Sequence, residues 1–184
     1  ACNYNDLATI DCYVEGQNID GFENLGSFEG SSYYKSELDT FTWQQANDIA
    51  IQNGGTLAII TSLAENNEIV LFSSDLDVVW IGLFQNMSAE YVNEGWQWVN
   101  GENFVFPDEV YWSEGSPNDY PTVEVENGQE NYAIFGNGSW DDRSGEAFFL
   151  LEMTECCTYV ENDCDVCEDG ELINNDSDSD GVCD

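Results

Sequence analysis

The order of helix and strand signals along the chain restricts its fold more than any other feature. Segments 42–55 and 62–72 each begin with a hydroxyl residue that is followed three positions later by Gln or Glu, which is typical of a helix N-terminus. The other apolar segments are short and several alternate, which indicates strands. They are 31–38, 56–60, 78–83, 95–99, 131–136, 138–140 and 146–153. Two early helices and many strands predict an α+β fold.

The first helix pattern also predicts which face of that helix is buried. Thr42 and Gln45 form the capping pattern, and the glycines at 54 and 55 end the helix. The residues between them place their apolar side chains on one helical face. These residues are Trp43, Ala46, Ile49 and Ala50.

The composition predicts a folded protein with an unusual charge. The chain has 184 residues, 42% of them hydrophobic and 14% aromatic, which is enough to build a buried core. Its formal net charge is −36, and Lys35 and Arg143 are its only basic residues. Nucleic acid and anionic membranes are held by clusters of basic side chains, so we expect neither as a partner. Bound cations would reduce the self-repulsion, and an acidic surface suited to salty surroundings is the other explanation.

The seven cysteines divide the chain into three parts. They lie near the two ends, and none is found between residues 13 and 155. We expect a Cys-containing arm at 1–20, a main domain at 21–154 and a Cys- and Asp-rich tail at 155–184. The pattern indicates disulfides in an exported protein, with one thiol left free or paired outside the chain. No apolar run is long enough for a transmembrane helix and no signal peptide is visible, so we expect no membrane insertion.

The motifs of the main domain follow one another in a recognisable order. GGTLAIITSLAEN (54–66) is followed by WIGL (80–83) and EGWQWVNGE (94–102), and then by SPN (116–118) in an irregular stretch and GSWDD (138–142). Over about 130 residues this order resembles the C-type lectin-like domain. The resemblance implies an α+β fold with two helices, small antiparallel sheets and a long calcium-binding-type loop. A loop of this length without secondary structure is usually functional or disordered.

The resemblance further implies that the loop holds Ca²⁺, which bridges the protein to a sugar. A hard cation takes oxygen ligands, and two neighbouring sugar hydroxyls can supply two of them. The family pattern places metal ligands at Ser116, Asn118, Glu130, Asp141 and Asp142, with a cis bond before the loop proline. It places sugar contacts at Asn118, Glu130 and Asp141, and auxiliary calcium ligands at Glu94, Asp119 and Asn131.

The chain departs from the family pattern at several positions. Ser116 replaces a carboxylate or carboxamide, which weakens the metal site and removes one sugar contact. Asp141 replaces an asparagine, which adds a charge and removes an N–H donor to the sugar. The usual disulfide positions are occupied by other residues, so packing must hold the fold, and such cysteine-free versions look bacterial. These positions are Ala50, Tyr132, Gly145 and Leu151.

The same residues also have structural explanations. Many domains of this family bind neither calcium nor sugar, Pro117 can simply shape a turn, and Asp141 and Asp142 can be solvated. Trp140 is expected in the core rather than as a surface for sugar stacking. Tyr111, Trp112 and Tyr120 are candidates for stacking on a sugar, and packing of the loop or core explains them equally well.

The two ends resemble other extracellular modules. The tail residues Asp176, Asp178, Asp180 and Asp184 surround Gly181, and alternating oxygens in a tight loop can wrap around one Ca²⁺. The pattern resembles the thrombospondin type 3 repeat, and a solvated acidic tail is the alternative. The arm ACNYNDLATIDC (1–12) resembles short repeats of large secreted bacterial proteins.

These observations lead to two hypotheses about function. The first is a calcium-dependent carbohydrate-binding module of a secreted or cell-surface bacterial protein, with a carbohydrate or glycoprotein as its partner. The second is a structural subunit or repeat module of an extracellular adhesin or fibre, in which calcium and disulfides join neighbouring copies without sugar binding. An enzyme is not expected, because the chain has no histidine and no nucleophile motif.

Overall fold

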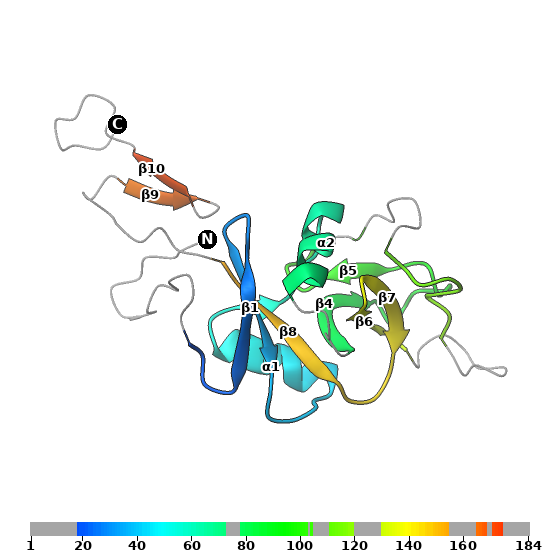
Figure 1. Cartoon of the computed structure of the whole chain (residues 1–184). Coiled ribbons are helices and arrows are strands. Elements are labelled where there is room, and N and C mark those ends of the chain that lie inside the picture. Colours follow the sequence, from blue (N-terminus) through cyan, green and yellow to red (C-terminus); the bar gives the residue numbers. More distant parts are fainter. Residues whose placement is uncertain are drawn as a thin grey trace.

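The structure is a computed structural model that describes residues 18–72, 78–102, 104, 111–119 and 130–154, with the backbone of 165–168 and 171–174. Two helices and a mixed sheet make up an α+β fold, as predicted (Figure 1). The elements in chain order are β1 (Phe22–Phe28), β2 (Ser31–Ser36), α1 (Trp43–Gln52), β3 (Thr56–Leu57), α2 (Leu63–Phe72), β4 (Val79–Gln85), β5 (Trp96–Trp98), β6 (Tyr132–Gly136), β7 (Ser139–Arg143), β8 (Phe148–Thr154), β9 (Asp165–Glu168) and β10 (Glu171–Asn174).

Both helices begin where the local signals predict. Thr42 accepts a hydrogen bond from the Gln45 backbone at 3.4 Å, and the Gln45 side chain accepts one from the Thr42 backbone at 3.0 Å. Ser62 accepts from the backbone of Glu65 at 3.1 Å at the start of α2. The predicted inner face of α1 is confirmed, since Trp43, Ala46 and Ala50 are buried and Ile49 is partly buried.

The sheet is larger than the small antiparallel sheets that the sequence predicts. Its strands lie in the order β1-β2-β8-β4-β6-β7, with β3 paired to β8 and β5 paired to β4. The pairing of β4 with β8 is parallel, and it joins two antiparallel groups of strands into one sheet. The sequence prediction missed β1 and also the β9–β10 hairpin, and β3 is shorter than the predicted strand 56–60.

The core has two parts because successive residues of a strand point to opposite faces of the sheet. Tyr33 and Val79 belong to one buried cluster, and their chain neighbours Tyr34 and Trp80 belong to the other. The first cluster includes Ile69 of α2, and the second includes the buried face of α1. The two helices therefore cover different faces of the sheet.

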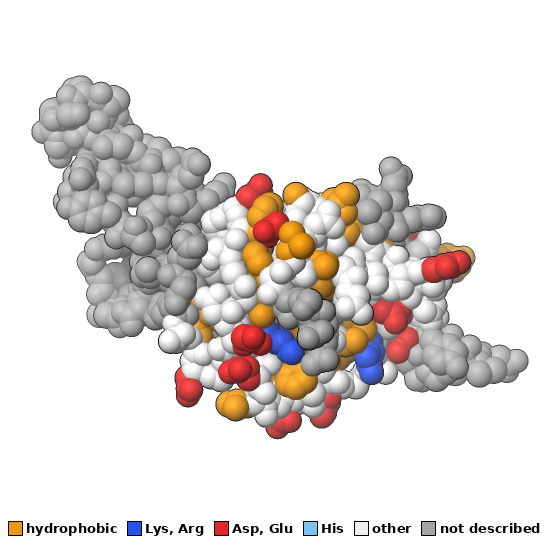
Figure 2. Space-filling model, viewed as in Figure 1, with side chains coloured by type: hydrophobic (Ala, Val, Ile, Leu, Met, Phe, Trp, Pro, Cys, Tyr) orange, Lys and Arg blue, Asp and Glu red, His pale blue; other side chains and the backbone are white. Residues whose placement is uncertain are grey.

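Acidic side chains are spread over the visible face of the molecule and do not form one patch (Figure 2). Hydrophobic groups lie between them on the same face. Dispersed acids are what a strongly charged but folded chain requires, because separation in water weakens their mutual repulsion. In the described part of the chain, neither helix has the length and apolar character needed to cross a membrane.

Candidate functional site

The two acidic motifs that are separated in sequence meet in the structure. Asp142 of β7 accepts hydrogen bonds from the backbone N–H groups of Asn118 at 2.8 Å and Asp119 at 2.6 Å. The Ser116 hydroxyl donates to Asp141, the neighbour of Asp142, and the Asn118 amide donates to the Ser116 hydroxyl at 3.3 Å. The bond between Ser116 and the following proline is cis, as the family pattern implies.

Trp140 fixes β7 against the start of this loop. Its backbone N–H donates to Tyr111 at 2.6 Å, and its carbonyl accepts from Ser113 at 2.8 Å. The indole N–H donates to the side chain of Asn66 on α2 at 3.0 Å. Trp140 is completely buried, which confirms its predicted place in the core.

Two aromatic residues proposed for sugar stacking are instead part of the core. Tyr111 stacks on Trp140 with ring centroids 4.7 Å apart, and Trp112 packs edge-to-face on Trp96 at 4.8 Å. Both Tyr111 and Trp112 are buried, so of the two explanations given for them the packing role holds and the stacking role does not. The sequence of an irregular loop does not show which of its aromatic residues are anchored by a strand elsewhere in the chain.

Glu130 completes the acidic side of the site. Its backbone N–H donates to the carboxylate of Asp119 at 2.9 Å, which brings the two ends of the segment 119–130 together. Burial and, after it, the nearby charges of Asp142 and Asp141 together raise the pKa of Glu130 to about 7. The site therefore concentrates negative charge that a cation would stabilise.

Asp142 is almost completely enclosed, with 3% of its surface exposed. Burial raises its pKa, whereas the N–H donors of Asp119 and Asn118 lower it. Both carboxylate oxygens receive hydrogen bonds from Asn118. Asp142 thus holds the loop backbone directly, a role that the family pattern did not predict.

The chemistry of the donor set fits Ca²⁺, which prefers hydroxyl, amide and carboxylate oxygens. Asn118 is exposed, and Ser116 and Asp141 are half-buried, so an ion can reach these three side chains. Across the described ranges, however, no group of three or more acidic, Cys or His side chains lies close enough to hold a metal ion. In the arrangement seen here Asp142 points its oxygens at backbone N–H groups, and a metal would compete with those hydrogen bonds.

Two of the expected auxiliary calcium ligands, Glu94 and Asn131, lie around Gln85 at the end of β4. The Gln85 side chain donates to the carbonyl of Glu94 at 2.8 Å, and its backbone N–H donates to the carbonyl of Asn131 at 2.8 Å. Asn131 and Asp119 are buried, whereas Glu94 is exposed. The structure brings the backbones of Glu94 and Asn131 to one place and leaves the Glu94 side chain at the surface.

The remaining predicted sites lie outside the described residues. They are the stacking candidate Tyr120 and the tail acids Asp176, Asp178, Asp180 and Asp184.

A second group of acids, which the sequence did not single out, lies under the sheet near α2. Glu65 accepts from the Tyr33 hydroxyl at 2.7 Å and from the backbone N–H of Thr61 at 2.8 Å. Glu152 accepts from the Ser31 hydroxyl at 2.7 Å and from the backbone of Ile59 at 2.8 Å. The sequence signal was misleading here, because Glu65 also satisfies the helix-start pattern, which usually puts an acid at the surface.

Comparison with known proteins agrees with this arrangement. CD209 antigen from Symphalangus syndactylus is 31% identical over 131 residues, which cover 69% of this chain and 31% of CD209 antigen. The structure of the mouse scavenger receptor C-type lectin carbohydrate-recognition domain covers 76% of this chain and 99% of its own, with 20% identity and a TM-score of 0.60. The chain contains a C-type lectin-like domain. This lectin-like domain matches about a third of the length of CD209 antigen, and no family model matches the chain.

Solved structures show what this fold accommodates in other proteins. The cow CD23 carbohydrate-recognition domain, solved in the presence of a GlcNAc2Man3 oligosaccharide, has a TM-score of 0.57 and 21% identity, and covers 77% of this chain and 98% of its own. A calcium-independent type II antifreeze protein has a TM-score of 0.53 and 22% identity, and covers 76% of this chain and 95% of its own. The likeness to lectin domains agrees with the expectation that this domain is not an enzyme. The relatives named here include a primate protein, and these comparisons do not support a bacterial source or a fibre.

Proposed function

We propose that the lectin-like domain is an extracellular carbohydrate-binding module in which Ca²⁺ at the loop site holds a neutral sugar. The observation that carries the proposal is the meeting of the loop 116–119 with β7 and Glu130, which gathers four carboxylates, an amide and a hydroxyl. The raised pKa of Glu130 supports it, because mutual repulsion among these acids favours a bound cation.

The loop residues divide into those that hold the loop and those that reach a ligand. Asp142 and Asp119 are buried and bind backbone N–H groups, so they set the loop conformation. Asn118 is exposed and Asp141 and Glu130 are half-buried, which supports a role for these three in metal and sugar contacts. Ca²⁺, when bound, would supply the attachment point for two sugar hydroxyls.

The choice of a glycan as the ligand is based on solved structures of the same fold. The cow CD23 domain was solved in the presence of an oligosaccharide of GlcNAc and mannose, and the C-type lectin domain of murine dendritic cell inhibitory receptor 2 was solved with an N-glycan. The net charge of −36 repels anionic sugars, so a neutral glycan of a glycoprotein is the better partner for this chain.

The test is isothermal titration of Ca²⁺ into chelated protein, comparing wild type with Asn118→Ala. Asn118 is exposed, so its truncation should leave the fold intact and remove one loop ligand. Asn67→Ala, at an exposed position of α2, is the matched control. Loss of a calcium site in Asn118→Ala alone supports the loop site. Equal titration curves for all three proteins would reject it and restrict calcium to other parts of the chain, such as the tail.

Sugar binding is tested separately on a glycan array with and without a chelator. Glycan signals that disappear on chelation and in Asn118→Ala support metal bridging. Signals that survive both changes would show that any sugar binds elsewhere on the domain.

The alternative is a scaffold that uses neither metal nor sugar at this loop. Asp142 supports it, because this residue already connects the loop to β7 without an ion. The likeness to a calcium-independent protein of the same fold points the same way. In that case the domain would be a structural module of an adhesin or fibre, and sedimentation of the full chain should show calcium-dependent association of neighbouring copies.

A further inference from the structure

A pocket of about 340 Å³ opens between α1, the end of β4 and the start of β6. Its aromatic walls are Trp43, Phe84 and Tyr132, and Met87 closes one side. Pockets that hold small molecules have volumes of roughly 300–1,000 Å³, so this one is large enough for a single small ring. None of its lining residues is charged, although the protein is strongly acidic.

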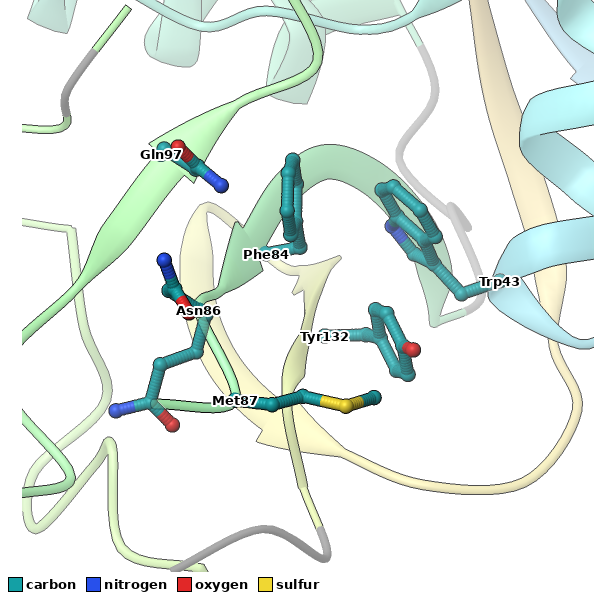
Figure 3. A pocket seen from close by; sticks show the side chains of 7 residues that line it. Trp43, Phe84, Asn86, Met87, Gln97 and Tyr132 are labelled. Carbon is teal, nitrogen blue, oxygen red and sulfur yellow. The ribbon is translucent and has the colours of Figure 1, made fainter. Parts of the chain in front are cut away.

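The aromatic rings form a continuous apolar surface. Trp43 stacks on Tyr132 with centroids 4.8 Å apart and planes 19° apart, and Phe84 lies 5.2 Å from Trp43 at 48°. Figure 3 shows Phe84 and Tyr132 between Trp43 on one flank and the amide residues on the other, with Met87 below Tyr132 in this view. Phe84 and Tyr132 are half-buried and Met87 is 73% exposed, so a ligand can reach this surface.

Three amide side chains supply polar groups around the rings. The NH₂ group of Gln85 donates hydrogen bonds to the carbonyls of Tyr91 at 2.9 Å and Glu94 at 2.8 Å. The group that Gln85 can offer a ligand is therefore its side-chain oxygen, which accepts. The side-chain oxygen of Asn86 accepts from the Ser88 backbone at 3.0 Å, which leaves its NH₂ group as a donor. Gln97 of β5 offers both kinds of group. Aromatic faces with donors and acceptors at their edge match a ligand that is apolar on its faces and hydroxylated at its rim.

The pocket adjoins the loop site along one strand. Tyr132 follows Glu130 by two residues, and the hydrogen bond from the Gln85 backbone to Asn131 at 2.8 Å continues the pairing of β4 with this segment. Alternate residues of an extended segment point to the same side and lie about 7 Å apart. The distance from a sugar bound at Glu130 to the aromatic surface is therefore about the length of one sugar unit.

We propose that this pocket is a second subsite that holds one neutral sugar ring of an oligosaccharide attached at the loop. The inference rests on the proposed function, and it makes the ligand an oligosaccharide rather than a single sugar. The C–H face of a pyranose packs on the negative faces of Phe84 and Tyr132. The ring hydroxyls exchange hydrogen bonds with Gln97 and Asn86. The uncharged lining and the acidic protein around it select a neutral ring.

Methionine NMR tests this directly, because the chain has two methionines. Met87 lies in the pocket, whereas Met153 is 8% exposed and packs in the core, where it serves as an internal reference. The full chain labelled with ¹³C at the methionine methyl groups is titrated in Ca²⁺ with the GlcNAc2Man3 pentasaccharide, and then with methyl mannoside and with GlcNAc. The pentasaccharide should shift the Met87 signal and leave the Met153 signal in place.

Affinities measured by calorimetry for three variants complete the test. Gln97→Ala should weaken pentasaccharide binding roughly fivefold, the effect of one hydrogen bond, and leave methyl mannoside binding unchanged. Gln52→Ala, which removes an exposed amide at the end of α1, should match wild type for both. Asn118→Ala should weaken both sugars, because it acts at the loop.

The outcomes separate the two proposals. If Asn118→Ala weakens both sugars while Met87 is silent and Gln97→Ala equals Gln52→Ala, the pocket subsite is rejected and the loop function stands. If Met87 shifts and Gln97→Ala weakens binding while Asn118→Ala and chelation have no effect, the pocket is a sugar site and the loop function is rejected. No pentasaccharide binding at all rejects both. A Met87 shift with N-acetyltryptophanamide but with no sugar would make the pocket a peptide-docking site and overturn the proposal.

Discussion

The two groups of acidic side chains in this domain are built from the same chemistry and behave differently. Glu65 and Glu152, near α2, accept hydrogen bonds from hydroxyl and backbone donors on strands and loops around them. At the loop, Asp142 is held in the same way, but Asp141 and Glu130 lie half-exposed beside it. The pair near α2 stabilises the fold, whereas the loop group retains repulsion that an external cation can relieve.

This difference shows that the number of acids does not identify a metal site. What matters is whether the protein itself supplies the donors. A carboxylate fully supplied with N–H and O–H donors gains little from a cation, and one facing other carboxylates and solvent gains more. The predictions below test this distinction.

Glu65→Ala should have the largest effect on stability. It removes the acceptor for the Tyr33 hydroxyl, which is 1% exposed, and for the Thr61 backbone N–H. Loss of the acceptor for the buried Tyr33 hydroxyl, together with the Thr61 bond, should cost about 3 kcal/mol, which urea unfolding would detect. Glu65→Gln keeps an acceptor and should lose less stability than Glu65→Ala. Glu68→Ala on the same helix is the control. Equal stability of Glu65→Ala and Glu68→Ala would contradict the structural role.

Asp142→Ala should lower stability by about 2 kcal/mol, because the N–H groups of Asn118 and Asp119 lose their acceptor. It should also abolish the rise in melting temperature on adding Ca²⁺, which Glu65→Ala should retain. Thermal melts with and without the ion measure both effects. Glu114→Ala, at an exposed position of the same loop, is the matched control. A calcium response in Asp142→Ala as large as in wild type would remove this residue from the metal site.

Glu152 should make stability decrease as the pH rises. Burial raises the pKa of its carboxyl above the ordinary value of 4.5, while the Ile59 and Ser31 donors lower it. The unfolded chain then releases this proton at a lower pH than the folded chain. The contribution to stability is therefore complete below about pH 4.5 and is lost as the pH rises through the folded pKa, by at most about 1.4 kcal/mol per pH unit.

Urea unfolding of wild type and Glu152→Gln across this pH range isolates the effect. The glutamine variant keeps an acceptor and does not titrate, so its stability should fall less steeply with pH. If stability falls equally with pH in wild type and Glu152→Gln, the Glu152 carboxyl has the same pKa in the folded and the unfolded chain.

Titration of Glu130 should give the smallest of these effects. It should change the affinity for Ca²⁺ rather than the stability of the fold. Its pKa is about 7, and calcium requires the deprotonated carboxylate. The affinity for Ca²⁺ should therefore be about tenfold lower at pH 6 than at pH 8. Calorimetry at the two pH values measures it, and Glu130→Gln should bind weakly with little pH dependence. A wild-type affinity that does not change between these values would exclude Glu130 as a ligand.

Local sequence signals were sufficient to predict the elements whose cause is local. The capping pattern of Thr42 and Gln45 depends on residues three positions apart, and so does the start of α2 at Ser62. The alternation in segment 95–99 likewise predicted a strand, which forms as β5 with Trp96 and Trp98 both buried. The order of the motifs was enough to indicate the lectin-like fold.

The contacts between distant parts of the chain arise from the packing of the folded domain. Glu152 meets Ile59 across a separation of 93 residues, and Asp142 meets Asn118 across 24. Tyr132 forms the pocket by stacking on Trp43, a helix residue far from it in sequence. Composition and periodicity describe each segment alone, whereas burial and hydrogen bonding of a carboxylate depend on which segments the sheet brings together. That is why carboxylates of the same chemical type stabilise the fold near α2 and form a candidate calcium site at the loop.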